Sequence, residues 1–272
     1  MNNQTKGYWT RKEEMAHKAY EHYIYMGRTF PKEINNSILN TKVFTELAEP
    51  IEKVKSQTTT IDVVDMDSVS AIFNYRDYNE KIAVLNFASY KNPGGMFLKG
   101  STAQEESLCH ASTLYNVLSQ FPEYYNYNKK NLNNALYTNR ALYSPNIIFG
   151  KDNLTTCCDV ITCAAPNWTT ANRYNRVSAN DNTHALVERI RFILQIASIQ
   201  EVDTLILGAF GCGVFGQNPF EVANIFMHYL TTTFAGDFKR IVFAIPSSKT
   251  NKNLQAFRTL FGCSKVIHND IL

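Results

Sequence analysis

Glu105 and Glu106 are adjacent acids that could do chemistry. A carboxyl group with a raised pKa can protonate the leaving oxygen of a glycosidic bond, and two close carboxylates cannot both ionise cheaply. Taken alone, the pair is more typical of an ordinary helix start, because acids in a first turn complement the helix dipole. The chemical interpretation gains weight from a glycine-rich segment a few residues before the pair.

That first segment reads Asn92-Pro93-Gly94-Gly95-Met96-Phe97-Leu98-Lys99-Gly100 and follows a predicted strand at 81–87. Glycine lets the backbone adopt positive φ angles and approach a ligand closely, so such a turn can bind an anion through its amides. Pro-Gly-Gly by itself is also typical of an ordinary turn. The segment therefore predicts a ligand-binding loop only in combination with other features.

The second glycine-rich segment is the stronger signal. It reads Gly208-Ala209-Phe210-Gly211-Cys212-Gly213-Val214-Phe215-Gly216 and lies between a predicted strand at 204–207 and a helix that opens at Asn218-Pro219. A helix N-terminus next to glycines favours phosphate. The segment lacks the Lys and Ser/Thr of a Walker loop and departs from the dinucleotide-binding spacing. Two such loops could hold a diphosphate from opposite sides.

The two loops and the intervening Gln104-Glu105-Glu106, in this order, resemble the signature of bacterial-type poly(ADP-ribose) glycohydrolases, a family of the macrodomain superfamily. The resemblance covers roughly residues 58–247. It implies a macrodomain fold and hydrolysis of the ribose–ribose O-glycosidic bonds of poly(ADP-ribose) without a metal or other cofactor.

The resemblance also implies roles for individual residues. Glu106 resembles the catalytic acid, Glu105 the carboxylate that holds ribose hydroxyls, and Phe215 the aromatic residue that packs on the distal ribose. The residues expected at the ligand are Asn86, Asn92, Gly94, Gly95, Met96, Gln104, Gly208, Gly211, Cys212, Gly213, Val214, Phe215 and Gly216. For Asn86, a plain hydrogen-bonding role at the end of a strand is an equal alternative.

Met96 departs from the family pattern, which has a third glycine at this position. A Cβ and a thioether there could narrow the approach to the diphosphate or to the anomeric carbon. One alternative is therefore a module that binds ADP-ribose without turnover. A second is a hydrolase that removes mono-ADP-ribose from protein or nucleic acid, and a third is an unrelated α/β nucleotide-binding enzyme.

The elements that must position these residues alternate along the chain. The predicted strands are 58–64, 81–87, 146–149, 159–164, 204–207 and 240–245, and the predicted helices are 10–27, 67–74, 103–118, 183–199, one from 218, and 251–261. Residues 30–56 are ambiguous, and 121–140 read as irregular surface. Strands that are apolar on both faces predict an α/β fold with a mixed, largely parallel sheet flanked by helices. We expect residues 1–57 to be an N-terminal helical extension packed on a domain of residues 58–272.

Composition limits the class of protein. With 272 residues, of which 44% are hydrophobic, the chain can bury one large core. A net charge of +3 is too small to imply a nucleic-acid surface, and no apolar run is long enough to span a bilayer. We expect a cytoplasmic monomer with six reduced cysteines and no metal site. Among the histidines, only His110, one helical turn beyond Glu106, merits a functional test.

Overall fold

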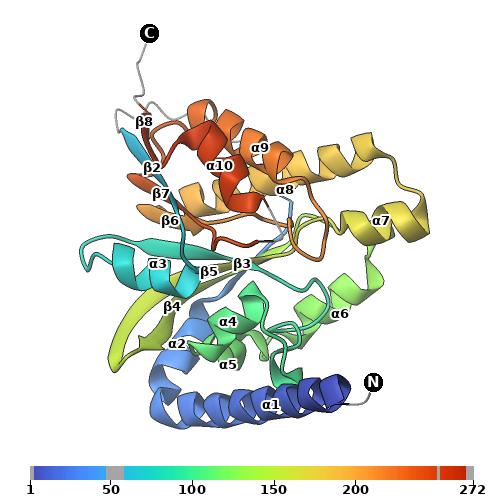
Figure 1. Ribbon diagram of the computed structural model, residues 1–272. Helices are drawn as coiled ribbons and strands as arrows, with labels where there is room; N and C mark the ends of the chain where they lie inside the picture. The colour runs from blue at the N-terminus through green and yellow to red at the C-terminus, as the bar shows by residue number, and fades with distance from the viewer. Residues whose placement is uncertain (1–2, 47–57, 250–251, 268–272) are drawn as a thin grey trace.

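An eight-stranded sheet in the order β1-β4-β5-β3-β6-β7-β2-β8 forms the centre of the protein (Figure 1). The structure is a computed structural model and describes residues 3–46, 58–249 and 252–267. The strands are β1 (Lys42–Phe44), β2 (Thr59–Val64), β3 (Ile82–Phe87), β4 (Ala141–Lys151), β5 (Leu154–Cys163), β6 (Thr204–Leu207), β7 (Arg240–Ala244) and β8 (Ser264–Ile267). The pairs β5–β3, β3–β6, β6–β7 and β7–β2 are parallel, and the other neighbours are antiparallel. The predicted fold class is confirmed.

Helices cover both faces of this sheet. They are α1 (Asn3–Thr29), α2 (Pro31–Asn40), α3 (Ser68–Tyr75), α4 (Gln104–His110), α5 (Leu114–Leu118), α6 (Pro122–Lys130), α7 (Trp168–Asn175), α8 (Ala179–Ile199), α9 (Pro219–Thr231) and α10 (Asn253–Phe261), with short 3-10 turns η1 (Phe97–Lys99) and η2 (Asn133–Ala135). In Figure 1, α8, α9 and α10 lie on one side and α1 to α5 on the other.

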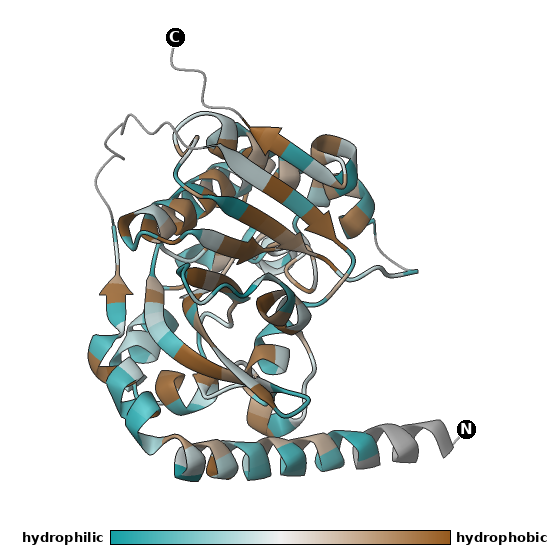
Figure 2. Cartoon of the chain, turned by 90° about the vertical axis from the view of Figure 1, so that its left-hand side faces the viewer, coloured by the Kyte–Doolittle hydropathy of each residue, from teal (hydrophilic) through white to brown (hydrophobic). Residues whose placement is uncertain are grey.

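Strand β3 shows how both faces are buried. Ala83 and Leu85 pack in the apolar cluster that includes α8, α9 and α10, whereas Ile82 and Val84 pack with α3, α4 and α5. Successive side chains of a strand point to opposite faces, so a strand covered on both sides reads as a continuous apolar run. Figure 2 shows brown segments running through the middle of the sheet, while α1 alternates teal with brown.

The N-terminal helix is longer than predicted. It runs from Asn3 to Thr29, so the predicted start at residue 10 was wrong, and the helix ends two residues beyond the predicted end at about residue 27. A Cβ at Gly27 would lie 3.1 Å from Asn116 Nδ2, so this glycine serves close packing on α5 and not termination. The helix ends before Pro31, which occupies the first turn of α2.

The ambiguous segment 30–56 forms α2 and then β1, and residues 47–56 lie outside the described residues. Because β1 pairs with β4, this part of the chain also contributes one edge of the sheet. The division into an extension of residues 1–57 and a domain of residues 58–272 stays a prediction.

The helix predicted at 103–118 is broken into α4 and α5. The break is caused by β4: Ser112 forms an isolated β-bridge with Phe149, and Thr113 N donates to Ile148 O at 3.0 Å. The backbone amide of Thr113, which would pair within a continuous helix, is therefore hydrogen-bonded to β4 instead. As a result, the acid pair sits on a helix of only seven residues.

The middle of the chain contains more regular structure than predicted. In place of two short strands, β4 and β5 form a long antiparallel hairpin whose turn, Asp152 and Asn153, has φ of 49° and 64°. Left-handed Asp and Asn are typical of two-residue hairpin turns. Segment 121–140 contains α6 and η2, and α7 and β8 were not predicted.

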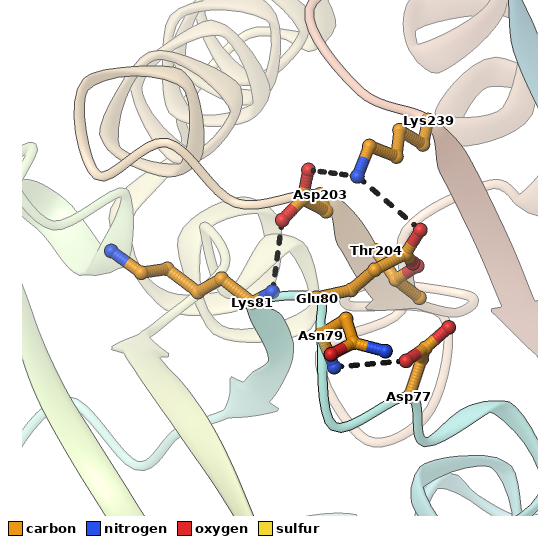
Figure 3. A network of polar contacts seen from close by, with 7 residues as sticks. All are labelled: Asp77, Asn79, Glu80, Lys81, Asp203, Thr204 and Lys239. Carbon is orange, nitrogen blue, oxygen red and sulfur yellow. Dashed lines mark hydrogen bonds and ion pairs between the residues drawn. The ribbon is translucent and has the colours of Figure 1, made fainter.

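A polar network holds the amino ends of the central strands, at the opposite end from the glycine loops (Figure 3). Lys239 Nζ lies 3.0 Å from Asp203 Oδ1 and 3.4 Å from Glu80 Oε1. Asp203 Oδ2 also accepts a hydrogen bond of 2.9 Å from the Lys81 backbone amide. These contacts join the residues that lead into β3, β6 and β7.

Candidate active site

The two glycine-rich segments start side by side because β3 and β6 are parallel neighbours. A cavity of about 480 Å³, here called the cleft, opens between them at the carboxyl ends of these strands. The predicted residues that line it are Gly95, Met96, Gln104, Glu105, Glu106, Gly211, Gly213, Val214 and Phe215. Ligands of open α/β sheets bind at this edge.

Glu105 is buried, with 3% of its surface exposed, at the floor of the cleft. Its Oε2 accepts a hydrogen bond of 2.6 Å from the Ser89 amide, and its Oε1 accepts one of 3.2 Å from Asn86 Nδ2. Burial raises the pKa of Glu105 to about 8, and the neighbouring Glu106 charge adds to the rise, against the lowering effect of these hydrogen bonds. The Glu105 carboxyl group therefore takes up a proton more readily than an exposed glutamate does.

Glu106 is also buried, with 5% exposed, but its two oxygens have different surroundings. Oε1 accepts a hydrogen bond of 2.8 Å from the Met96 amide. Oε2 has no hydrogen-bond partner in the structure, although it is shielded from solvent. A buried carboxylate oxygen without a partner costs free energy unless a proton or a ligand group meets it.

Gly95 brings the first loop into contact with both acids. A Cβ at this position would lie 2.5 Å from Glu106 Oε1 and 2.9 Å from Glu105 Oε2, and the residue has φ of 60°. Both the close approach and the left-handed backbone require glycine here. Its neighbour Gly94 packs behind the cleft, where a Cβ would meet the ring of Tyr115 at 2.7 Å.

Met96, the departure from the family pattern, contributes through its backbone. Its amide holds Glu106, and its φ of −113° is one that any residue can adopt. The side chain is 41% exposed at the rim of the cleft. The backbone at this position therefore does not require glycine.

The side chain of Gln104 forms hydrogen bonds with the backbone at the end of β3. Its Oε1 accepts from the Phe87 amide at 2.9 Å, and its Nε2 donates to Leu85 O at 2.9 Å. The ladder between β3 and β6 ends at Val84, so the side-chain amide of Gln104 serves in place of a neighbouring strand. This contact fixes the first turn of α4 against the strand and thereby positions both acids.

Six predicted residues do not line the cleft: Gly94, described above, and Asn86, Asn92, Gly208, Cys212 and Gly216. Asn86 is fully buried and donates to Glu105 and, at 3.3 Å, to Thr162 Oγ1. Asn92 shapes the turn, since its carbonyl accepts from the Gly95 amide at 3.1 Å. Gly208 packs against Phe87, and Cys212 is half-buried, which raises the pKa of its thiol to about 12.

The second loop folds over the cleft against α7. A Cβ at Gly216 would lie 2.4 Å from Thr169 Oγ1, and its φ is 73°. A Cβ at Gly211 would lie 2.8 Å from both Ala165 and Gln217. Gly213 has open space around it, and Val214 is 86% exposed, so the middle of the loop faces solvent.

An aromatic wall closes one side of the cleft; Phe215 was predicted to lie there, whereas Tyr90 and Tyr137 were not. It consists of Tyr90, Tyr137 and Phe215. The rings of Tyr90 and Tyr137 stack with centroids 4.2 Å apart, and Tyr137 meets Phe215 edge-on at 6.2 Å. Tyr137 falls in the segment predicted to be irregular surface, and the run of asparagines before it was the only signal of an unusual turn.

Two other features lie away from the acids. A larger cavity of about 860 Å³ occupies the opposite end of the sheet, where its lining includes Lys81, Tyr143 and Asp159 and neither glycine loop. His110 does not line the cleft, since its ring packs on Phe97 with centroids 4.7 Å apart.

In the described part of the chain, no His, Cys, Asp and Glu side chains are grouped as metal ligands. Within the same ranges, every helix is too short or too polar to cross a membrane.

Comparison with known proteins gives the family. A profile for the family described as microbial-type PARG, catalytic domain, matches residues 12–152, just over half of the chain. No match was found among curated proteins. Poly(ADP-ribose) glycohydrolase from Thermomonospora curvata, bound to the inhibitor ADP-HPD, is similar with 27% identity, a TM-score of 0.82 and coverage of 91% of this chain and 99% of that one. Poly(ADP-ribose) glycohydrolase (PARG) from Deinococcus radiodurans, in complex with ADP-ribose, is similar with 33% identity, a TM-score of 0.76 and coverage of 83% and 96%. The chain therefore belongs to the microbial-type PARG family.

Proposed function

We propose that this protein hydrolyses the ribose–ribose O-glycosidic bonds of poly(ADP-ribose), with Glu106 as the general acid and base. The observation that carries the proposal is the arrangement of Glu106, a residue of the cleft lining whose Oε1 is fixed by a backbone amide while its buried Oε2 has no hydrogen-bond partner. The relatives from Thermomonospora curvata and Deinococcus radiodurans, which bind the inhibitor ADP-HPD and ADP-ribose respectively, support this choice of substrate.

In the proposed reaction, Glu106 gives its proton to the leaving ribose oxygen as the bond to the anomeric carbon breaks. The resulting oxocarbenium-like carbon is attacked by water, and the Glu106 carboxylate takes the proton of that water, which restores the starting state. Acid–base assistance of this kind contributes about two to four orders of magnitude in rate. No metal or other cofactor takes part in this scheme.

Glu105 has the complementary task of holding ribose hydroxyls. Burial raises its pKa to about 8, so Glu105 takes up a proton more readily than an exposed glutamate does, and in its neutral form it does not oppose ionisation of Glu106 during the cycle. Its hydrogen bonds to Ser89 and Asn86 fix its orientation before the ligand binds. Preorganised polar groups of this kind avoid a cost of rearrangement during the reaction.

The two glycine loops are proposed as the phosphate-binding loops of a macrodomain. The second loop leads directly into α9, whose N-terminus is capped by the side chain of Asn218 and carries Pro219 in its first turn. The partial positive charge of a helix N-terminus favours an anion. Phe215, in the aromatic wall, is proposed to pack on the distal ribose.

The alternative of a module that binds without turnover rests on Met96. It is the weaker proposal, since the Met96 amide reaches Glu106 in a backbone conformation that needs no glycine. Removal of mono-ADP-ribose from protein or nucleic acid would need the same acid and the same loops. Hydrolysis assays on poly- and on mono-ADP-ribosylated substrates therefore distinguish these two activities.

The test compares the wild type with Glu106→Gln. We expect the variant to lose at least about a hundredfold in the rate of poly(ADP-ribose) hydrolysis, while calorimetry shows ADP-ribose binding within about threefold of the wild type. Glu123→Gln, at an exposed position on α6, is the matched control. Undiminished hydrolysis by a folded Glu106→Gln protein would exclude Glu106 as the acid.

The same assay decides between the functions. A wild type that binds ADP-ribose but hydrolyses neither poly- nor mono-ADP-ribosylated protein would identify a binding module. The cytoplasmic location, the monomeric state and the lack of a nucleic-acid surface stay predictions.

A further inference from the structure

A left-handed turn carries Tyr137 to the aromatic wall. Asn133, Asn134, Ala135 and Tyr137 have φ of 44°, 51°, 70° and 63°, so four non-glycine residues within five adopt a conformation that L side chains disfavour. Such a cluster persists only where the surrounding structure fixes it, and it is characteristic of functional sites.

Donors from outside the turn hold its carbonyl groups. The Asn167 amide donates to Ala135 O at 2.9 Å, and Asn175 Nδ2 donates to Asn134 O at 3.1 Å. The next carbonyl, that of Leu136, accepts from Arg189 Nη2 at 3.2 Å. The last of these donors is charged and comes from α8, far along the chain.

Arg189 is almost fully buried, with 1% of its surface exposed, and every hydrogen-bond acceptor recorded for it is neutral. Its Nε donates to Asn139 Oδ1 at 2.7 Å, and its Nη1 donates to the carbonyl of Ala164, directly after β5. A buried cation is costly unless its donors are satisfied, and the planar guanidinium can satisfy three acceptors in one plane. The Arg189 side chain thus ties the end of β5 to the turn on both sides of Tyr137.

The group held in this way lies in the cleft. Tyr137 stacks on Tyr90, which leads into the first loop, and meets Phe215 of the second loop. Its ring therefore links Tyr90, before the first loop, to Phe215 of the second loop.

We propose that Arg189 is a positioning residue: its guanidinium holds the left-handed turn at 133–137 and thereby fixes Tyr137 as the wall against which the ADP-ribose unit is bound. The proposal rests on the function proposed above and adds a residue that does not line the cleft. It assigns Arg189 to ligand binding through Tyr137 and not to the proton transfer at Glu106.

The experiment is a double-mutant cycle with Arg189→Lys and Tyr137→Leu. For each protein, the Kd of ADP-ribose and the KM and kcat of poly(ADP-ribose) hydrolysis are measured. We expect Arg189→Lys to raise Kd and KM about tenfold and to leave kcat within about threefold, because both acids keep their contacts. Residues that act through one contact are not additive, so the double variant should bind no more weakly than Tyr137→Leu alone. Arg191→Lys, on the same helix and paired with Glu188, should bind like the wild type.

Several results would overturn the proposal. One is an unchanged Kd in Arg189→Lys, with or without a lower melting temperature, and another is a double variant whose losses multiply. If Arg189→Lys does not fold, Asn139→Ala removes only the acceptor of Nε; a rise in Kd of about threefold supports the proposal, and no rise refutes it. A wild type that neither binds ADP-ribose nor hydrolyses the polymer would overturn the proposed function itself, and the role of Arg189 with it.

Discussion

Glu105 should make the stability of this protein fall as the pH rises, and one substitution should remove that effect. Its carboxyl group is buried, and its pKa is raised from 4.5 to about 8 in the folded protein. Between these two values the folded state binds more protons than the unfolded state. The free energy of unfolding must therefore decrease with increasing pH over this range.

The size of the effect follows from the same two pKa values. Each unit of difference between the two pKa values corresponds to about 1.4 kcal/mol. The free energy of unfolding is therefore higher by roughly 5 kcal/mol at a pH where Glu105 is neutral in both states than at a pH where it is ionised in both. Between about pH 5 and about pH 9 the loss is roughly 4 kcal/mol. In urea, with a slope of about 3 kcal/mol per molar, this corresponds to a midpoint shift of about 1 M.

The assay is urea unfolding of the wild type and Glu105→Gln at about pH 5 and about pH 9. Taking the difference between the two proteins cancels the other titrating groups. The wild type should lose roughly 4 kcal/mol more than the variant. Glu201→Gln, at an exposed position after α8, should follow the wild type. Parallel pH profiles for the wild type and Glu105→Gln would refute the reasoning that the acid is buried in the folded state.

Three further predictions concern a glycine of the cleft, a helix cap and two buried histidines. Gly95→Ala should lower the rate of hydrolysis at least about a hundredfold, because the new Cβ would displace both acids and the backbone at this position is left-handed. Gly150→Ala is the control and should keep full activity, since its Cβ would meet only one atom, at 4.0 Å. An active Gly95→Ala enzyme would contradict the geometry. Asp67→Ala removes the cap that accepts from the Ser70 amide and should cost about 1 kcal/mol in thermal unfolding, which an unchanged melting temperature would disprove. Burial lowers the pKa of His22 and of His110, so the free energy of unfolding of the protein should decrease as the pH falls below 6.5. The variant in which both histidines are changed to Gln should lose less of this free energy between about pH 7 and about pH 5. Equal losses in the two proteins would show that neither ring is buried in its neutral form.

The central strands and both glycine loops were predictable because their signals are local. The predicted strands 58–64, 81–87, 204–207 and 240–245 differ from β2, β3, β6 and β7 by at most one residue at either end. Each is a short run rich in β-branched or other apolar residues and is bounded by polar or glycine residues. Because β3 and β6 are parallel, the loops after them meet in space, and the acid pair lies between them.

The features that were missed depend on distant contacts. The helix at 103–118 breaks because β4 bridges to Ser112, and nothing near Ser112 in the sequence signals that bridge. The position of Tyr137 depends on a turn held by Arg189, a residue of α8. The Arg189 side chain is buried although it is charged, and its three hydrogen-bond acceptors come from other segments of the chain.

Strand β2 has a consequence for how the chain is made. It lies near the beginning of the sequence, but its two neighbours in the sheet, β7 and β8, are the last two strands of the described chain. During synthesis, both edges of β2 stay unpaired until β7 and β8 have been made. Unpaired apolar strands are prone to join other chains, and late long-range pairing slows folding. A chain that ends prematurely before β7 should therefore aggregate, even though its acid pair and both glycine loops have been completed.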